Sequence, residues 1–151
     1  GSEMCIRDSK PANILIDDHG LVKVVDFGLA SAATQSDARL TKTGILVGTP
    51  TYMAPEQARG HGIDARTDIY SLGVILYEMF TGRPPYSGGE PMAILLKHIE
   101  GNAPPLRTAN PALPAALEEV VSRAMCADLD SRYQTFAELR ADLERCMREC
   151  A

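Results

Sequence analysis

The segment from Asp68 to Phe80 constrains the fold most, because it is apolar nearly all round a helix. It is followed by Gly82 and Pro84, two residue types that commonly end helices. Its apolar positions are Ile69, Leu72, Val74, Ile75, Leu76, Met79 and Phe80. A helix that is hydrophobic on every side has to be surrounded by other parts of the chain. The sequence therefore predicts a central helix around which the rest of a domain packs.

Three further helices are expected on the C-terminal side of this segment. Residues 91–100 open with Pro91 and close with Gly101, the usual asymmetry of a helix start and stop. An amphipathic helix follows Pro114, with Leu117, Val120, Val121, Ala124 and Met125 as its apolar positions. The last helix begins near residue 136, with Thr135 and Glu138 as a capping box and with Phe136, Leu139, Leu143 and Met147 on one face.

A small β-hairpin is expected at the front of the chain. Residues 13–17 and 21–25 are rich in β-branched residues and flank a short turn, in which Gly20 can adopt a positive φ. Residues 29–50 are small, polar and threonine-rich without any period, which indicates a long functional loop. The predicted fold class is α+β and mainly helical, with one small hairpin.

Composition and charge exclude several classes of protein. The 151 residues suit one domain, and a net charge of −5 argues against a chain built to coat nucleic acid or anionic lipid. The longest apolar run, residues 73–77, is far shorter than the roughly 20 residues of a membrane helix. Four cysteines form no disulfide framework, so reduced thiols and a cytoplasmic location are expected. Cys146 and Cys150 are interpreted as free thiols rather than as half of a metal site.

Polar residues at the open end of the hairpin suggest a metal site. Asn13 begins the first strand and Asp26 ends the second, so folding of the hairpin should bring them close together. Amide and carboxylate oxygens suit Mg²⁺, which takes one or two protein oxygens together with phosphate oxygens. Asp8, one loop away, could accept a proton from a hydroxyl, and Lys10 could offset the charge of a transferring phosphoryl group.

Several ordered motifs together resemble the C-terminal lobe of a protein kinase. They are Arg7-Asp8-x-Lys10-Pro11-Ala12-Asn13, Asp26-Phe27-Gly28, Ala54-Pro55-Glu56 and Asp68-Ile69-Tyr70-Ser71-Leu72-Gly73. A lysine two residues after the aspartate is the serine/threonine version, and residues 48–57 are similar to the bacterial, eukaryotic-like (Hanks-type) branch. The resemblance runs from about residue 6 to residue 147.

The resemblance implies a role for individual residues. Asp8 would be the catalytic base, Lys10 the contact to the γ-phosphate of ATP, and Asn13 and Asp26 the Mg²⁺ ligands. Thr49 would pack against Asp8 and Lys10 where the substrate hydroxyl is received. Arg7 would read a phosphorylated activation loop, in which Thr41 and Thr43 would be autophosphorylated. Glu56 would form a buried bridge with Arg132, and Asp68 would hold the backbone of the catalytic loop.

The same resemblance implies partners. Serine and threonine hydroxyls of proteins would be the substrates, and a homodimer could support autophosphorylation. No nucleic-acid partner is expected and no membrane segment is predicted in the chain, although the parent protein could carry an anchor elsewhere.

Two departures from the family, one at the start of the chain and one in its missing motifs, leave alternatives open. At the start, Ile6 stands where the family usually has histidine, and residues 1–9 (GSEMCIRDS) look like a translated sequencing-adapter tract. On that interpretation Arg7 and Asp8 match the motif by chance, and residues 10–151 are a partial kinase domain. The sequence also contains no Gly-x-Gly-x-x-Gly, so we expect the nucleotide-binding N-terminal lobe to be missing and the isolated chain to be inactive.

The second hypothesis is therefore a pseudokinase or docking module that binds proteins, and a third and weaker one is a carboxylate–metal phosphohydrolase. The histidines carry no predicted chemistry. His19 is expected in the turn, His61 in a loop and His98 on a helix face.

Overall fold

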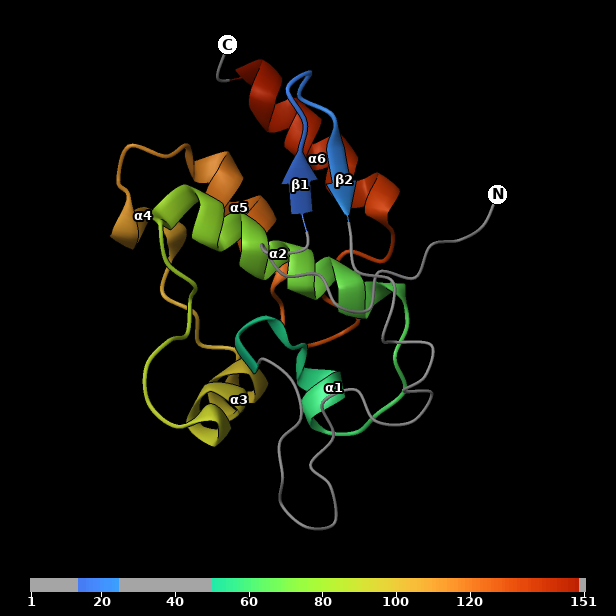
Figure 1. Cartoon of the computed structure of the whole chain (residues 1–151), viewed down its shortest axis with the longest axis vertical. Coiled ribbons are helices and arrows are strands. Elements are labelled where there is room, and N and C mark those ends of the chain that lie inside the picture. The colour runs from blue at the N-terminus through green and yellow to red at the C-terminus, as the bar shows by residue number, and fades with distance from the viewer. Residues whose placement is uncertain (1–13, 25–49, 150–151) are drawn as a thin grey trace.

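The computed structural model describes residues 14–24 and 50–149, which form a small antiparallel sheet and a helical body (Figure 1). The strands are β1 (Ile14–Ile16) and β2 (Val22–Val24), and a 3-10 turn, η2, covers Pro50–Tyr52. The helices are α1 (Pro55–Ala58), α2 (Ala65–Thr81), α3 (Pro91–Glu100), α4 (Leu106–Ala109), α5 (Ala115–Ala124) and α6 (Phe136–Glu149). The mainly helical α+β class predicted from the sequence is confirmed.

The hairpin forms as predicted. Ile14 pairs with Val24 and Ile16 with Val22 in an antiparallel register. Asp17 closes the turn, because its side-chain Oδ1 accepts hydrogen bonds from two backbone N–H groups within the next four residues, at 3.0 and 2.9 Å. Gly20 has a φ of 78°, a conformation that glycine adopts without a steric penalty. His19 lies exposed in this turn, as expected.

Helix α2 crosses the middle of the helical body (Figure 1), as its apolar sequence predicts. It is longer than expected and begins at Ala65, because the side chain of Asp64 accepts a hydrogen bond from the backbone N–H of Arg66 at 2.8 Å and so caps the helix. It ends at Gly82, whose φ of 80° is left-handed. One expectation fails at its last turn, where Met79 is 68% exposed rather than enclosed.

The core lies between α2, α5 and α6. One cluster of buried residues joins α2 to the start of α1, to α4 and to α5: Ala54, Tyr70, Val74, Tyr77, Leu106, Leu117, Val121 and Met125. A second cluster joins α2 to α5 and α6: Ile69, Val120, Ala124, Tyr133, Leu139 and Cys146. Leu143 packs against both clusters. Gly73 of α2 permits the close approach of α5, since a Cβ there would lie 3.0 Å from the Cβ of Ala124.

Helix α6 differs from the prediction in the face that it buries. Leu139 is 1% exposed, but Phe136 is 40% and Met147 is 72% exposed. Cys146 is buried in place of Met147, because the rotation of the helix against α5 turns position 146 inward. The capping box is altered too: Thr135 accepts from the N–H of Glu138 at 3.2 Å, while the Glu138 carboxylate accepts from the N–H of Gln134 instead of that of Thr135.

The shortest helical elements were not predicted from the sequence. Helix α3 has the predicted bounds, but η2, α1 and α4 were not expected, since three or four residues are too few to show a helical period. His61 lies exposed in a loop, as predicted. Within residues 14–24 and 50–149, no helix has the length and apolar character needed to cross a membrane.

Candidate functional site

A buried ion pair joins two segments that are distant in the sequence. Glu56 in α1 is 3% exposed, and Arg132, in the segment before α6, is fully buried. The two Nη atoms of Arg132 donate to the two carboxylate oxygens of Glu56 at 2.8 and 3.2 Å. The pairing that the kinase resemblance implies for these residues is therefore present in the structure, with the two-pronged geometry that makes arginine–carboxylate pairs strong.

The remaining polar atoms of this pair also have partners. Thr67 Oγ1 donates to Glu56 Oε1 at 2.8 Å. Arg132 donates to two backbone carbonyls, that of Arg66 from Nη1 at 2.8 Å and that of Cys126 from Nε at 2.9 Å. Burial alone would raise the pKa of Glu56, but the hydrogen bonds and the positive charge of Arg132 outweigh it, so the pKa of Glu56 lies below its ordinary value.

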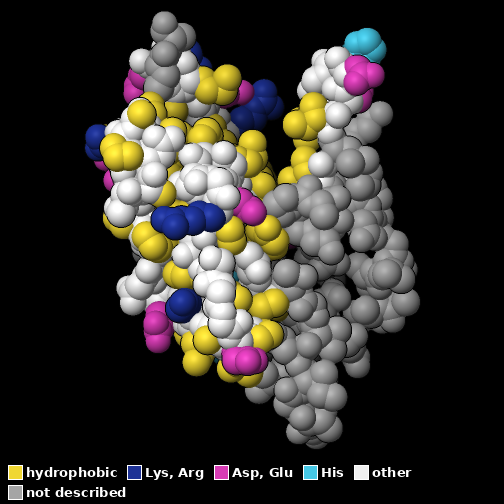
Figure 2. Space-filling model, turned by 60° about the vertical axis from the view of Figure 1, so that its left-hand side comes forward, with side chains coloured by type: hydrophobic (Ala, Val, Ile, Leu, Met, Phe, Trp, Pro, Cys, Tyr) yellow, Lys and Arg dark blue, Asp and Glu magenta, His cyan; other side chains and the backbone are white. Residues whose placement is uncertain are grey.

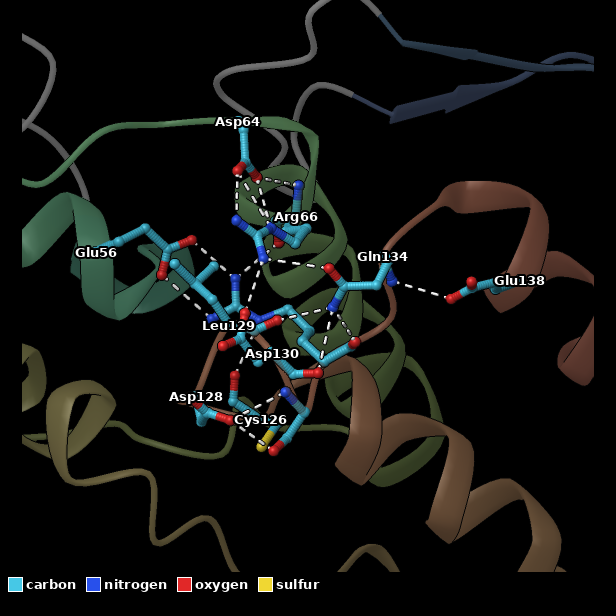
Figure 3. Close-up of polar contacts among 11 residues, drawn as sticks. Glu56, Asp64, Arg66, Cys126, Asp128, Leu129, Asp130, Gln134 and Glu138 are labelled. Carbon is cyan, nitrogen blue, oxygen red and sulfur yellow. Dashed lines mark hydrogen bonds and ion pairs between the residues drawn. The ribbon is translucent and has the colours of Figure 1, made fainter.

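A more exposed polar network surrounds the start of α2 (Figure 3). Besides the cap on the backbone, Asp64 accepts from the Arg66 guanidinium at 2.8 Å, which lowers the pKa of Asp64. Arg66 also donates to Gln134 Oε1 at 3.2 Å and lies 3.5 Å from Asp130. The segment before α6 is thus held against the N-terminus of α2 by side chains as well as by Arg132.

The segment 50–58 is fixed to α2 at two further places. The hydroxyl of Tyr52 donates to Glu78 Oε2 at 2.7 Å, and Ser71 Oγ donates to the carbonyl of Tyr52 at 2.8 Å. Burial, together with the acceptor Glu78, raises the pKa of Tyr52. Residues 50–58 therefore have a defined position on the central helix, immediately after Thr49 in the sequence.

His98 lies on a face of helix α3, as expected, and that face is buried in the core. It is fully buried in α3, its Nδ1 is 2.8 Å from the hydroxyl of Tyr70, and its ring packs edge-on against Tyr86 with centroids 4.8 Å apart. Burial lowers the pKa of His98 to about 4, so the ring is neutral at pH 7. The spacing of His98 from Ile94 and Leu95, which are also buried, is the sequence signal that could have found it.

Most of the predicted catalytic and regulatory residues lie outside the described residues: Arg7, Asp8, Lys10, Asn13, Asp26, Thr41, Thr43 and Thr49. Cys150 also lies outside them, whereas the Cys146 thiol is buried. Asp68 is 6% exposed in the first turn of α2. Its contact with the catalytic loop stays a prediction.

Comparison with known proteins decides the family. A family model described as a protein kinase domain matches residues 2–142. The chain belongs to the protein kinase family. The resemblance seen in the sequence motifs is thereby confirmed, and the helical body with its small hairpin is part of a kinase domain.

Curated relatives of this kinase chain are bacterial. Serine/threonine-protein kinase PknB of Mycobacterium tuberculosis (strain H37Rv) is 46% identical over 139 residues, which cover 92% of this chain and 22% of that protein. The protein of the same name in Mycolicibacterium smegmatis is 48% identical over 140 residues, with the same two coverages. A probable serine/threonine-protein kinase of Streptomyces coelicolor, SCO3848, is 40% identical over 141 residues, or 93% of this chain and 21% of that protein. The chain spans about a fifth of the length of these relatives.

Membership of the protein kinase family implies a general type of reaction. Protein kinases use ATP together with a divalent metal ion and act on protein hydroxyls. Among residues 14–24 and 50–149, no cluster of three or more histidine, cysteine, aspartate or glutamate side chains is arranged to hold a metal ion. Asn13 and Asp26, the predicted metal ligands, lie outside that part.

Proposed function

We propose that this chain is the catalytic-lobe portion of a serine/threonine protein kinase, which transfers the γ-phosphoryl group of ATP to serine or threonine hydroxyls of proteins. Support comes from its membership of the family and from the names of its relatives. The observation that carries the proposal is the register of the hairpin, in which Ile14 lies opposite Val24.

That register supports a shared metal site for two residues. Asn13 directly precedes Ile14, and Asp26 follows Val24 by two residues. Antiparallel pairing brings the start of one strand beside the end of the other, so the register favours a position for both residues at the same end of the hairpin. Their amide and carboxylate oxygens are hard donors that fit Mg²⁺. The chemistry of this donor set is therefore compatible with the metal that the family uses.

The proposed roles of the other residues follow from charge and proton balance. Asn13 and Asp26 would hold Mg²⁺, which would offset the negative charge of the ATP phosphates. Asp8 accepts the proton of the substrate hydroxyl while the oxygen of that hydroxyl forms a bond to the γ-phosphorus of ATP. The bond between the γ-phosphorus and the bridging oxygen breaks, and ADP leaves. Lys10 stabilises the negative charge on the transferring group. Asp68 would hold the loop that contains Asp8.

The described contacts anchor the segment that directly follows Thr49 in the sequence. Residues 50–58 are held by the ion pair of Glu56 and by the hydrogen bonds of Tyr52. A threonine that directly precedes such an anchored segment has a fixed point from which to position a substrate hydroxyl. Phosphorylation of Thr41 and Thr43, read by Arg7, would then order the part of the loop before Thr49.

A chimera tests the proposed function. Residues 10–142 would replace the matching segment of Mycobacterium tuberculosis PknB, which supplies the rest of a kinase domain. We expect ATP-dependent phosphorylation of a protein substrate on serine or threonine, and a loss of at least a hundredfold in Asp26→Asn. Glu119→Gln, an exposed change on α5, is the matched control and should retain activity.

A folded chimera that binds ATP but is no more active than its Asp26→Asn variant would refute the proposal. The pseudokinase or docking hypothesis would then be favoured. Paramagnetic line broadening by Mn²⁺ shows whether an inactive chimera still has the metal site. If Mn²⁺ binds there, it broadens the resonances of nearby residues in the unmutated chimera and not in its Asp26→Asn variant.

A further inference from the structure

Helix α3 holds a polar side chain in the core with one of its two nitrogens unpaired. His98 is fully buried, and its Nδ1 lies 2.8 Å from the hydroxyl of Tyr70. The other ring nitrogen, Nε2, is buried too and has no hydrogen-bond partner among residues 14–24 and 50–149. Nearly all buried polar atoms in folded proteins have a partner, so an exception marks either a bound water or a contact with a role in the working protein.

Aromatic neighbours fix the orientation of the His98 ring. Tyr70 and Tyr86 lie edge-on to it, with ring centroids 5.6 and 4.8 Å away. Tyr70 also contacts the guanidinium of Arg132, which lies 4.9 Å from the centre of the tyrosine ring. The ring of His98 is therefore joined through Tyr70 to the ion pair that holds Glu56, and Nε2 points in a fixed direction.

The backbone of Thr51 is the group that can partner Nε2. Helix α3 packs against both η2, which contains Thr51, and α1. The Thr51 backbone raises the pKa of His98, although burial outweighs this effect. A carbonyl oxygen that faces a ring N–H has such an effect, because it stabilises the protonated ring. Since Nδ1 already lies against the Tyr70 hydroxyl, the Thr51 carbonyl is assigned to the side of Nε2.

The position of the single ring hydrogen follows from these partners. The ring of His98 is neutral at pH 7, so only one of its nitrogens carries a hydrogen. If Nδ1 carried it, Nε2 would be an acceptor that faces a carbonyl, which is an acceptor as well. If Nε2 carries it, the Tyr70 hydroxyl donates to Nδ1 and the N–H of Nε2 faces an acceptor. The second arrangement is the favourable one.

We propose that Nε2–H of His98 donates a hydrogen bond to the carbonyl of Thr51, so that α3 positions the segment that directly follows Thr49 in the sequence. An adjustment of η2 against α3 that brings the two atoms into hydrogen-bond geometry completes the contact. The inference rests on the proposed function, in which Thr49 lies where the substrate hydroxyl is received. His98 contacts neither ATP nor the substrate and is a positioning residue.

Two substitutions separate the two nitrogens of the ring. The amide of asparagine reaches the position of Nδ1, whereas the amide of glutamine reaches the position of Nε2. His98→Asn can therefore still bond to Tyr70 but not to Thr51, and His98→Gln can donate to Thr51. Both variants lose the aromatic ring, so a merely structural role of that ring would affect the two alike.

Kinetics of the PknB chimera described above give the functional readout. His98→Asn should raise the KM for the protein substrate about fivefold, the effect of one hydrogen bond of ordinary strength. The KM for ATP should stay unchanged, because the segment after Thr49 serves the protein substrate. His98→Gln should restore most of the loss. An equal KM for the protein substrate in the two variants, or an equal rise in the KM for ATP, would overturn the proposal.

Nuclear magnetic resonance of the 151-residue chain with ¹⁵N-labelled histidine rings tests the position of the hydrogen. We expect a hydrogen on Nε2 of His98 and none on Nδ1, in signals that disappear in His98→Gln. His61 and His19 are exposed internal controls, and Figure 2 shows a histidine side chain standing clear of the body at the hairpin turn, where His19 lies. Their signals should be averages of the two tautomers. A hydrogen on Nδ1 of His98 would contradict the proposal.

The carbonyl ¹³C resonance of Thr51 tests the contact itself, again without any activity. It should differ between His98→Asn and His98→Gln, whereas that of Tyr52, whose carbonyl accepts from Ser71 Oγ, should be the same in both. If the Thr51 resonance does not distinguish the two variants, the proposal is wrong and a buried water is the partner of Nε2. An inactive chimera would count against the proposed function alone, because these resonances do not depend on catalysis.

Discussion

Replacement of Glu56 by glutamine tests how much the buried ion pair with Arg132 contributes to stability. Glutamine keeps the shape of glutamate and removes its charge, so the guanidinium of Arg132 stays fully buried without a counter-ion. Breaking a buried ion pair from one side costs about 3–5 kcal/mol. Since the amide oxygen can still accept one of the two hydrogen bonds from Arg132, we expect a loss near the lower limit, about 3 kcal/mol.

Urea unfolding followed by far-ultraviolet circular dichroism measures this loss. For a chain of this size, about 3 kcal/mol corresponds to a melting temperature lower by roughly 6–12 °C. Glu144→Gln is the matched control, because it breaks an exposed i,i+4 pair with Arg140 on α6 and should have no measurable effect. If Glu56→Gln destabilises the chain no more than Glu144→Gln does, the reasoning from burial is wrong.

A double-mutant cycle separates the pair from its surroundings. Arg132→Met leaves the Glu56 charge buried and also leaves the carbonyls of Arg66 and Cys126 without their donor. The double variant, Glu56→Gln with Arg132→Met, removes both charges, so its loss of stability should be smaller than the sum of the single losses. Additive losses would show that the two residues act independently.

The pH dependence gives a second check on Glu56. The pKa of Glu56 in the folded protein lies below the reference value of 4.5, so the pair stabilises the fold fully above pH 4.5 and less as the pH falls through the folded pKa. Wild type should therefore lose more stability than Glu56→Gln below pH 4.5. Parallel curves for the two proteins in that range would contradict the assigned direction.

Three other predictions concern different parts of the molecule. Burial lowers the pKa of His98 from 6.5 to about 4, so its contribution to stability is complete above pH 6.5 and is lost between pH 6.5 and 4. In His98→Gln, the free energy of unfolding in urea should therefore depend less on pH across that window than in wild type. The same pH dependence in both proteins would contradict this prediction. Gly73→Ala should lower the free energy of unfolding in urea by about 1–3 kcal/mol, because the new Cβ would lie 2.9 Å from Met125 Cγ. Gly62→Ala, with open space around the new Cβ, is the control and should leave stability unchanged. Equal effects of the two substitutions would contradict the packing argument. The 151 residues alone should transfer no phosphate, because they hold no Gly-x-Gly-x-x-Gly; a radiolabelled-ATP assay that finds robust transfer, lost in Asp26→Asn, would disprove this.

Sequence patterns predicted the elements whose signals are local. The Gly20 turn, the bounds of α3 and the stop of α2 at Gly82 follow from residue types that act within a few positions. The start of α2 was placed too late, because the apolar period begins at Ile69 while the cap is a polar residue five positions earlier, Asp64.

Burial and contacts that depend on residues distant in the sequence were harder to predict from the sequence. Periodicity placed Phe136 and Met147 on the apolar face of α6, but the face that packs against the core contains Leu139 and Cys146, so Phe136 and Met147 stay exposed. The contact between Tyr52 and Glu78 spans 26 residues, and no local pattern indicates it. The Glu56–Arg132 pair spans 76 residues and came from family resemblance rather than from spacing.

The long span of the Glu56–Arg132 pair has a consequence for the order of events on the ribosome. Glu56 leaves the exit tunnel well before Arg132 has been synthesised, at the usual pace of about 5–20 residues per second. During those seconds the carboxylate of Glu56 lacks the guanidinium that neutralises it in the folded protein, although the contacts of Tyr52 with α2 can already form. The ion pair is therefore completed only when nearly the whole domain has emerged, and a polypeptide released before residue 132 would never acquire it.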